Sequence, residues 1–114
     1  MSNQVERESR IHMNAIMLHE TDNVATALRN LAAGEEIVVG VQEHSRRVRV
    51  VQPILFGHKL AVTEIGQGAN ILKYGEVIGR ATQAIPTGCH AHVHNIESLR
   101  GRGDLAAQET SHGV

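Results

Sequence analysis

The chain has 114 residues, the size of one domain, and apolar residues make up 41% of it, although Phe56 and Tyr74 are the only Phe, Trp or Tyr side chains. A net charge of −1 excludes the basic patch of a nucleic-acid-binding protein, and the scarcity of aromatic rings excludes a base-stacking surface. No apolar run is long enough to cross a membrane, the polar start is not a secretory signal and the one cysteine excludes an internal disulfide, so we expect a cytoplasmic protein.

The first expected elements are an arm and a strand. Residues 1–10 are polar and charged without apolar periodicity, which predicts a flexible N-terminal arm. The folded domain is expected over 11–100, and the apolar segment 11–18 suits its first strand.

One substantial helix is predicted near 22–33. Thr21-Asp22-Asn23 offers side chains that cap a helix N-terminus, and Gly34 suits the C-terminal cap. Apolar residues follow between them at helical spacing: Val24, Ala27, Leu28 and Leu31.

From residue 36 onward the pattern favours β-structure. Short runs rich in β-branched residues are separated by glycines, at 37–41, 48–51, 60–65, 71–72 and 77–78. Such runs predict a compact, mainly β domain, and no internal repeat of useful length is apparent.

A basic segment lies between two of these runs. Arg47 and Arg49 alternate with Val48 and Val50, so the arginines share one face of the expected strand. A phosphate or carboxylate site is one interpretation, but a solvated hairpin edge is favoured because Lys and Arg are common on edge strands. Residues 101–114 are expected to form a flexible C-terminal tail.

The most informative stretch is 88–95, in which His90, His92 and His94 occupy alternate positions. On a strand they would line one face, and a row of imidazoles is suited to binding a transition metal or to proton transfer. We favour that interpretation over a solvated face. Cys89, on the opposite face, is expected to be a small buried apolar residue.

Two glycine turns carry further candidate groups. His58 and Lys59 follow Gly57, and Lys73 and Tyr74 precede Gly75. These side chains offer proton transfer, cations for a carboxylate and a hydrogen-bond donor. Taken singly, each pair is more typical of a solvated turn or of rim packing.

Read in order, five blocks resemble the N-terminal, SAF-type β-clip domain of the altronate and galactarate dehydratases, over roughly residues 12–104. The blocks are Thr21-Asp22-Asn23-Val24-Ala25, Gly57-His58-Lys59-Leu60-Ala61, Ile71-Leu72-Lys73-Tyr74-Gly75, Ile78-Gly79-Arg80-Ala81-Thr82 and His92-Val93-His94-Asn95.

The resemblance implies a SAF-type β-clip fold and a part in a sugar-acid hydro-lyase that depends on a divalent metal, Fe²⁺ or Mn²⁺. It also implies a large catalytic dehydratase subunit as the partner, without which this chain is expected to be inactive. Association with further copies of the chain is left open. The catalytic residues implied are His58, Lys59, His92 and His94; the substrate-binding residues are Lys73, Tyr74 and Asn95; the metal ligands are His92 and His94.

The chain differs from the family pattern at His90, a position where the family has no histidine. We expect residues 58–59, 73–74 and 92–95 to converge on one surface cleft. Three functions are open: the small subunit of an altronate-type dehydratase, the small subunit of a sulfolactate sulfo-lyase, and a non-catalytic ligand-binding or assembly module. The junction at 97–104 favours the first.

Overall fold

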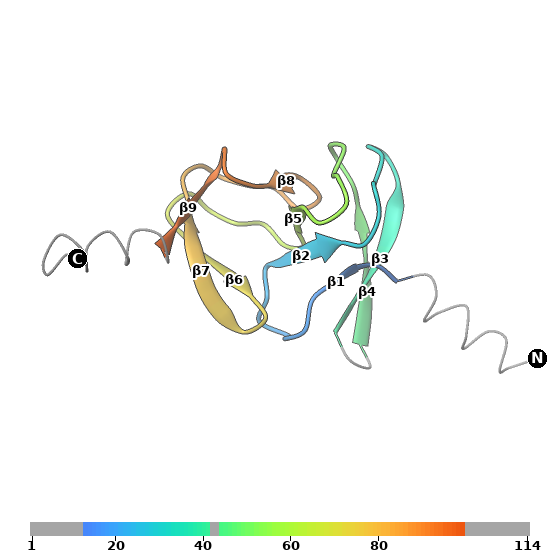
Figure 1. The fold of residues 1–114 in the computed structure, drawn as a ribbon, viewed down its shortest axis with the longest axis horizontal. Coiled ribbons are helices and arrows are strands. Elements are labelled where there is room, and N and C mark those ends of the chain that lie inside the picture. The colour runs from blue at the N-terminus through green and yellow to red at the C-terminus, as the bar shows by residue number, and fades with distance from the viewer. Residues whose placement is uncertain (1–12, 42–43, 100–114) are drawn as a thin grey trace, which may run out of the picture.

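A computed structural model describes residues 13–41 and 44–99, and the described chain is built from strands (Figure 1). The named strands are β1 (Met13–Ile16), β2 (Val24–Ala27), β3 (Glu36–Val41), β4 (His44–Arg49), β5 (Lys59–Ala61), β6 (Asn70–Lys73), β7 (Glu76–Ala81), β8 (His90–Ala91) and β9 (Ile96–Ser98). The mainly β prediction is confirmed. The arm expected over 1–10 and the tail expected over 101–114 lie outside the described residues. Over 13–41 and 44–99, no helix has the length and apolar character to span a membrane.

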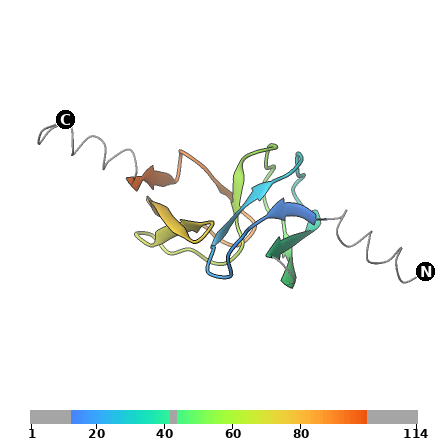
Figure 2. The same ribbon diagram turned by 60° about the horizontal axis from the view of Figure 1, so that its bottom comes forward.

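The strands form a six-stranded sheet in the order β4-β3-β1-β2-β5-β8 and a three-stranded sheet in the order β6-β7-β9 (Figure 2). Strand β4 lies at an edge and pairs with β3. Val48 and Val50 are buried, whereas Arg47 and Arg49 are exposed. The basic segment is therefore the solvated hairpin edge that was favoured from the sequence.

Two apolar cores lie on either side of β2 and β5. Val24 and Ala61 belong to the core shared with β6, β7 and β8, whereas Ala25 and Leu60 belong to the core shared with β1, β3 and β4. Successive side chains of a strand point to opposite faces, so each of these strands supplies both cores. Strands β2 and β5 thus fix the two halves of the domain to each other.

Four turns of one design connect the strands, although the sequence shows no internal repeat of greater length. In each, a buried Ala or Val is followed four residues later by a buried Leu or Ile, and three residues after that by a glycine with positive φ. Only glycine adopts that backbone conformation without strain. The units are Ala27–Leu31–Gly34, Val50–Ile54–Gly57, Ala61–Ile65–Gly68 and Ala81–Ile85–Gly88.

The turns pair two by two through reciprocal backbone hydrogen bonds. Leu31 and Ile54 exchange two bonds of 2.7 and 2.9 Å, and Ile65 and Ile85 exchange two of 3.0 and 2.8 Å. Each turn glycine also donates its N–H to the carbonyl of the first residue of the partner turn, at 2.7 to 2.9 Å. These bonds hold the second and fourth turns; the second ends directly before His58, and the fourth ends two residues before His90.

The helix predicted near 22–33 is wrong. Strand β2 (Val24–Ala27) lies in that segment and pairs with β1 on one edge and β5 on the other. Val24, Ala25 and Ala27 are each no more than 1% exposed. An amphipathic helix buries one stripe of its surface, whereas strand β2 buries side chains of both its faces in the two cores.

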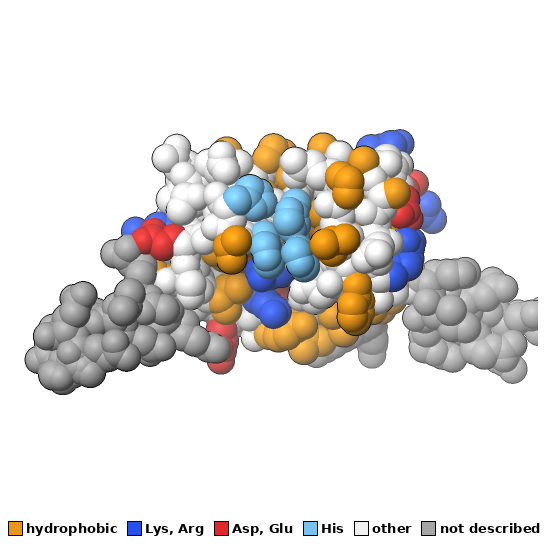
Figure 3. Space-filling model, turned by 45° about the horizontal axis from the view of Figure 1, so that its top comes forward, with side chains coloured by type: hydrophobic (Ala, Val, Ile, Leu, Met, Phe, Trp, Pro, Cys, Tyr) orange, Lys and Arg blue, Asp and Glu red, His pale blue; other side chains and the backbone are white. Residues whose placement is uncertain are grey.

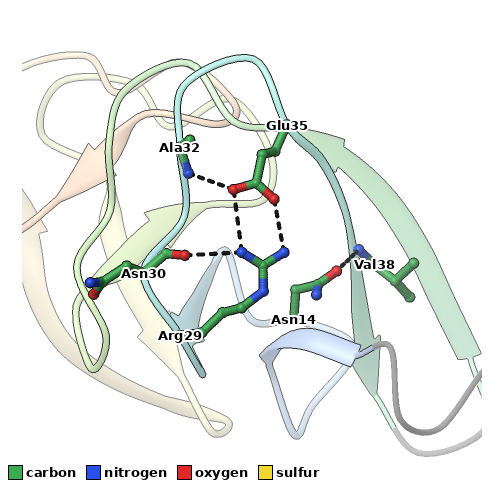
Figure 4. A network of polar contacts seen from close by, with 6 residues as sticks. All are labelled: Asn14, Arg29, Asn30, Ala32, Glu35 and Val38. Carbon is green, nitrogen blue, oxygen red and sulfur yellow. Dashed lines mark hydrogen bonds and ion pairs between the residues drawn. The ribbon is translucent and has the colours of Figure 1, made fainter.

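Residues after β2 form the first of the four turns, which a carboxylate stabilises (Figure 4). Glu35 accepts a 2.6 Å hydrogen bond from the Ala32 N–H and forms a 2.8 Å ion pair with Arg29. The hydrogen bond from Arg29, followed by that from Ala32, lowers the pKa of Glu35 to about 2. Gly34 accordingly shapes a tight turn and does not cap a helix.

Asp22, expected to cap that helix, instead accepts hydrogen bonds from four backbone N–H groups. It is 3% exposed, and its carboxylate accepts from Leu18, His19, Tyr74 and Gly75 at 2.8 to 3.2 Å. Tyr74 and Gly75 both have positive φ, of 55° and 79°, in the tight turn between β6 and β7. Asp22 therefore fixes that turn against the connection between β1 and β2.

Candidate functional site

His58 and His90 are brought together by strand pairing. His58 precedes β5, His90 opens β8, and the two strands pair with Leu60 opposite His90. Nδ1 of His58 lies 2.9 Å from Nε2 of His90, and the ring planes differ by 11°. Both rings are half-buried. The contact joins residues 32 positions apart, so no local spacing in the sequence could have predicted it.

His92 completes a cluster of three stacked imidazoles. Its ring centroid lies 4.0 Å from that of His58 and 5.3 Å from that of His90, with planes inclined by 11° and 15°. Ligand nitrogens of His58, His90 and His92 all lie within 4.8 Å of one another. We refer to these residues as the histidine cluster.

The expected strand with three histidines in a row is shorter than predicted. Strand β8 ends at Ala91, and the chain then turns, with the Asn95 N–H donating to the His92 carbonyl at 3.0 Å. His94 is exposed, and its ring lies 5.2 Å from that of His90 at a tilt of 33°. His94 therefore borders the histidine cluster without stacking in it.

Asn95 and Gln52 hold the backbone that carries the cluster. Asn95 is 5% exposed; its side chain accepts from the His92 N–H and donates to the His90 carbonyl, each at 2.9 Å. The Gln52 side chain accepts from the His90 N–H at 2.9 Å. Both amide atoms of Asn95 are thus used inside the loop, although the resemblance implied a substrate contact. Gln52 carried no motif that could have revealed its role.

A pocket of about 290 Å³ adjoins the cluster at His92. Its walls combine two lysines, one imidazole, a hydroxyl and aliphatic side chains: Lys59, Lys73, Ile78, His92, Val93, Ile96 and Ser98. Among these described lining residues there is no carboxylate. The pocket is therefore suited to an anion of modest size.

Burial lowers the pKa of three basic groups in and beside the pocket. Burial, followed by the charge of Lys73, lowers the pKa of Lys59. Burial, followed by repulsion from His58, lowers the pKa of both His90 and His92. Neutral imidazoles are the form that accepts a proton or binds a metal.

The predicted convergence is seen for most of the candidate residues. His58 and His92 stack, and Lys59, Lys73 and His92 share the pocket. Tyr74 is exposed and does not line that pocket; Lys73 Nζ lies 5.0 Å from the centre of its ring. Figure 3 shows histidine side chains gathered on one face, with basic and apolar side chains beside them.

Cys89 lies apart from this chemistry. It packs against the core shared with β6 to β8, and burial raises the pKa of its thiol. The sequence predicted a small buried apolar residue, and the side chain packs on the core as expected but is only partly buried.

The histidine cluster fits a divalent transition metal by its donor atoms. Imidazole nitrogen is a common ligand for such ions, and Nδ1 of His92 is buried without a hydrogen-bond partner in the described structure. The resemblance implied His92 and His94 as ligands. The geometry instead groups His92 with His58 and His90.

The amino-acid sequence is similar to one protein family and to several of its members. The family described as the altronate/galactarate dehydratase SAF domain matches residues 13–99. Altronate dehydratase of Escherichia coli (strain K12) is 46% identical over 83 residues, which are 73% of this chain and 16% of that protein. Subunit alpha of (2R)-sulfolactate sulfo-lyase from Chromohalobacter salexigens is 31% identical over 88 residues, 74% of this chain and 94% of that subunit.

A third relative, galactarate dehydratase (L-threo-forming) of Escherichia coli (strain K12), is 39% identical over 75 residues. The chain spans 16% of the length of the two altronate dehydratases it matches. With the family match extending from β1 through β9, this mainly β chain belongs to the altronate/galactarate dehydratase SAF-domain family.

Proposed function

We propose that this chain is the small component of a hydro-lyase that removes water from an aldonic or aldaric acid, and that a large dehydratase subunit completes its active site. The observation that carries this proposal is the pocket shared by Lys59, Lys73 and His92, which surrounds one space with two cations and an imidazole. The names of the dehydratase relatives support the reaction class.

Dehydration of a hydroxy acid removes a proton beside the carboxylate and expels a hydroxyl from the next carbon. Lys59 and Lys73 would bind the carboxylate and stabilise the negative charge that develops on it. His92 lines the same pocket, so its imidazole is placed either to take or return a proton or, when its lone pair is given to an ion, to hold the metal. A second proton-transfer role is assigned to His94, whose exposed ring lies 5.2 Å from that of His90.

A divalent metal, Fe²⁺ or Mn²⁺ in this proposal, would supply Lewis-acid stabilisation when bound. His92 would hold it together with neighbouring imidazoles. The part of this chain that the structure describes brings no carboxylate into the pocket, so a partner is expected to supply further groups and to close the site.

Exposed apolar side chains beside the site support a docking partner. Phe56, two residues before His58, is 66% exposed, and Val93, between His92 and His94, is 82% exposed. Large apolar side chains gathered around a polar site are typical of an interface. We assign this rim to the large subunit.

Elimination of sulfite from sulfolactate is the second candidate. The match to the sulfo-lyase relative covers 94% of that subunit, so a separate small subunit of this size has a precedent there. The same two lysines would bind the carboxylate of a sulfonated acid. The higher identity to altronate dehydratase favours loss of water.

The test combines this chain with the large dehydratase subunit of the same organism. Mixtures with Fe²⁺ or Mn²⁺ are assayed for keto-deoxy acids formed from aldonic and aldaric acids, and for sulfite released from sulfolactate. We expect keto-deoxy acid only when both subunits are present. Sulfite release would establish the second candidate. Full turnover by this chain alone, or an assembled complex without turnover on either substrate class, would contradict the proposal and favour a non-catalytic module.

A further inference from the structure

We propose that His58, His90 and His92 bind one divalent transition-metal ion through their imidazole nitrogens, and that His94 lies outside this ligand set. This deepens the proposed function by assigning its metal to three side chains. It rests on that function only for the role of the ion, because the ligands all belong to this chain.

The spacing of the three rings suits a single ion. Nδ1 of His58 and Nε2 of His90 are 2.9 Å apart, and the ligand atoms of all three residues lie within 4.8 Å of one another. Two nitrogens about 2.1 Å from an ion are about 3.0 Å apart at a right angle and about 3.4 Å apart at a tetrahedral angle. His58 and His90 have about that separation, and the ring of His92, which is stacked on His58, would have to tilt to direct its lone pair at the same ion.

His92 has an unmet polar group that an ion in the cluster would compensate. Its Nδ1 is buried and has no hydrogen-bond partner in the described structure. A buried polar atom without a partner is costly, so such atoms in native proteins call for an explanation. Metal binding through Nδ1 of His92 would give this atom a partner in the loaded protein.

The backbone of two ligands is held from outside the cluster. Asn95 bonds to the His92 N–H and the His90 carbonyl, and Gln52 bonds to the His90 N–H. Metal sites depend on such supporting contacts, which keep the ligands in position before the ion arrives. His94 is not positioned like the three ligands, because its ring is exposed and is tilted by 33° against that of His90.

The donor set also selects the kind of ion. The group consists of three imidazoles, with no carboxylate among the described residues that form it. Imidazole suits Fe²⁺, Co²⁺, Ni²⁺ and Zn²⁺, whereas Mn²⁺ and Mg²⁺ prefer oxygen ligands. Of the two metals considered for the proposed function, the cluster therefore favours Fe²⁺.

The test is metal binding by this chain alone, after treatment with a chelator. Zn²⁺ binding is measured by calorimetry, and Co²⁺ binding by visible absorption, which reports coordination geometry. We expect one ion per chain and much weaker binding of Mn²⁺. His58→Ala, His90→Ala and His92→Ala should each weaken Zn²⁺ binding by more than about 10-fold, the loss that even an outer partner of a ligand produces.

His94→Ala and His19→Ala are the matched controls, because each removes a histidine outside the cluster. Both should keep the wild-type affinity within about twofold. Glutamine replacements at positions 58, 90 and 92 repeat the test with a polar side chain of similar size, and circular dichroism verifies folding.

Absence of saturable binding, or an effect of His94→Ala as large as that of His90→Ala, would overturn the proposal. Its failure is distinguishable from failure of the proposed function. Partner-dependent turnover without metal binding by this chain removes only the three-histidine site, and metal binding without turnover in the complex removes only the dehydratase function.

Discussion

Nδ1 of His58 and Nε2 of His90 lie 2.9 Å apart, so one ring must donate the proton that the other accepts. Two neutral imidazoles satisfy this contact, whereas two protonated imidazoles would present N–H groups to each other. His92 stacks on His58 at 4.0 Å and adds a third ring to the same small volume. The contact therefore disfavours protonation of both rings at once, and burial lowers the pKa of His90 and His92.

Acidification should destabilise the metal-free protein. The pKa values of His90 and His92 are lower in the folded state than in the unfolded chain, chiefly because of burial. The unfolded chain therefore binds more protons as the pH falls below its histidine pKa of about 6.5. The free energy of unfolding is retained above that pH and declines below it until the folded pKa values are passed.

Urea unfolding at a series of pH values, with a chelator present, measures this dependence. A double variant, His90→Gln with His92→Gln, should show a flatter decline because it lacks both groups. An equally steep decline in the double variant would show that other residues cause the acid sensitivity.

The two pocket lysines should govern substrate binding in the complex with the large subunit. Lys59→Met and Lys73→Met each remove a cation while keeping much of the aliphatic side chain. A hydrogen bond to a charged group contributes about 1.5 to 3 kcal/mol, so each change should raise KM for the acid by about 10- to 100-fold. Steady-state kinetics of the complex provide the measurement.

Arg47→Ala is the control for general loss of positive charge. Arg47 lies on the edge strand β4, where it pairs with Glu36 at 3.7 Å, and it does not line the pocket. KM should stay unchanged in this variant. Equal KM values for the wild type and both lysine variants would exclude these lysines from carboxylate binding.

Local patterns in the sequence predicted the β-structure and singled out the histidines of 88–95, but they wrongly predicted a helix at 22–33. Asp22 has the chemistry of a helix cap, yet two of the N–H groups it accepts from belong to Tyr74 and Gly75, 52 and 53 positions away. A cap motif indicates only that the carboxylate can accept hydrogen bonds from backbone N–H groups. It does not indicate which N–H groups the fold places near that carboxylate.

The site shows the same limit. Proximity of His58 to His90 depends on pairing between β5 and β8, and β8 is only two residues long. The alternating histidines of 88–95 could therefore indicate His90 and His92 as site residues, but they could not indicate that His58 lies beside them. The repeated spacing of a small apolar residue, Leu or Ile, and Gly was present in the sequence and would have predicted the turns that carry His58 and His90.

Asp22 should contribute strongly to stability. Asp22→Ala leaves four backbone N–H groups in a part-buried region without their acceptor. Loss of hydrogen bonds to a buried charged group costs roughly 3 kcal/mol or more in the free energy of unfolding. Asp22→Asn keeps one acceptor oxygen and should fall between the alanine variant and the wild type.

Glu35→Ala is the matched control in urea unfolding. Glu35 is also a carboxylate that accepts a backbone N–H, but it lies at an accessible turn with Arg29. Its removal should destabilise the protein less than removal of Asp22. The opposite order would show that the bonds to Asp22 add little to stability.

Gly88 and Gly68 should differ sharply in their tolerance of alanine, although they occupy equivalent positions in two paired turns. Their φ values are 88° and 86°, so both substitutions carry the strain of a left-handed residue, about 1 to 2 kcal/mol. A Cβ at Gly68 meets nothing within 4 Å, whereas a Cβ at Gly88 would collide with the backbone oxygen of Arg49 and lie 3.1 Å from Val51.

Backbone cannot move aside as a side chain does, and the Gly88 carbonyl already accepts a 2.8 Å hydrogen bond from the Val51 N–H. Overpacking adds about 1 to 3 kcal/mol to the strain, so Gly88→Ala should unfold at clearly lower urea than Gly68→Ala or fail to fold. Because Gly88 lies two residues before His90, a folded Gly88→Ala protein should also bind Zn²⁺ more weakly than Gly68→Ala. Equal stability of the two variants would mean that the close approach of these chains does not constrain the turn that carries the histidine cluster.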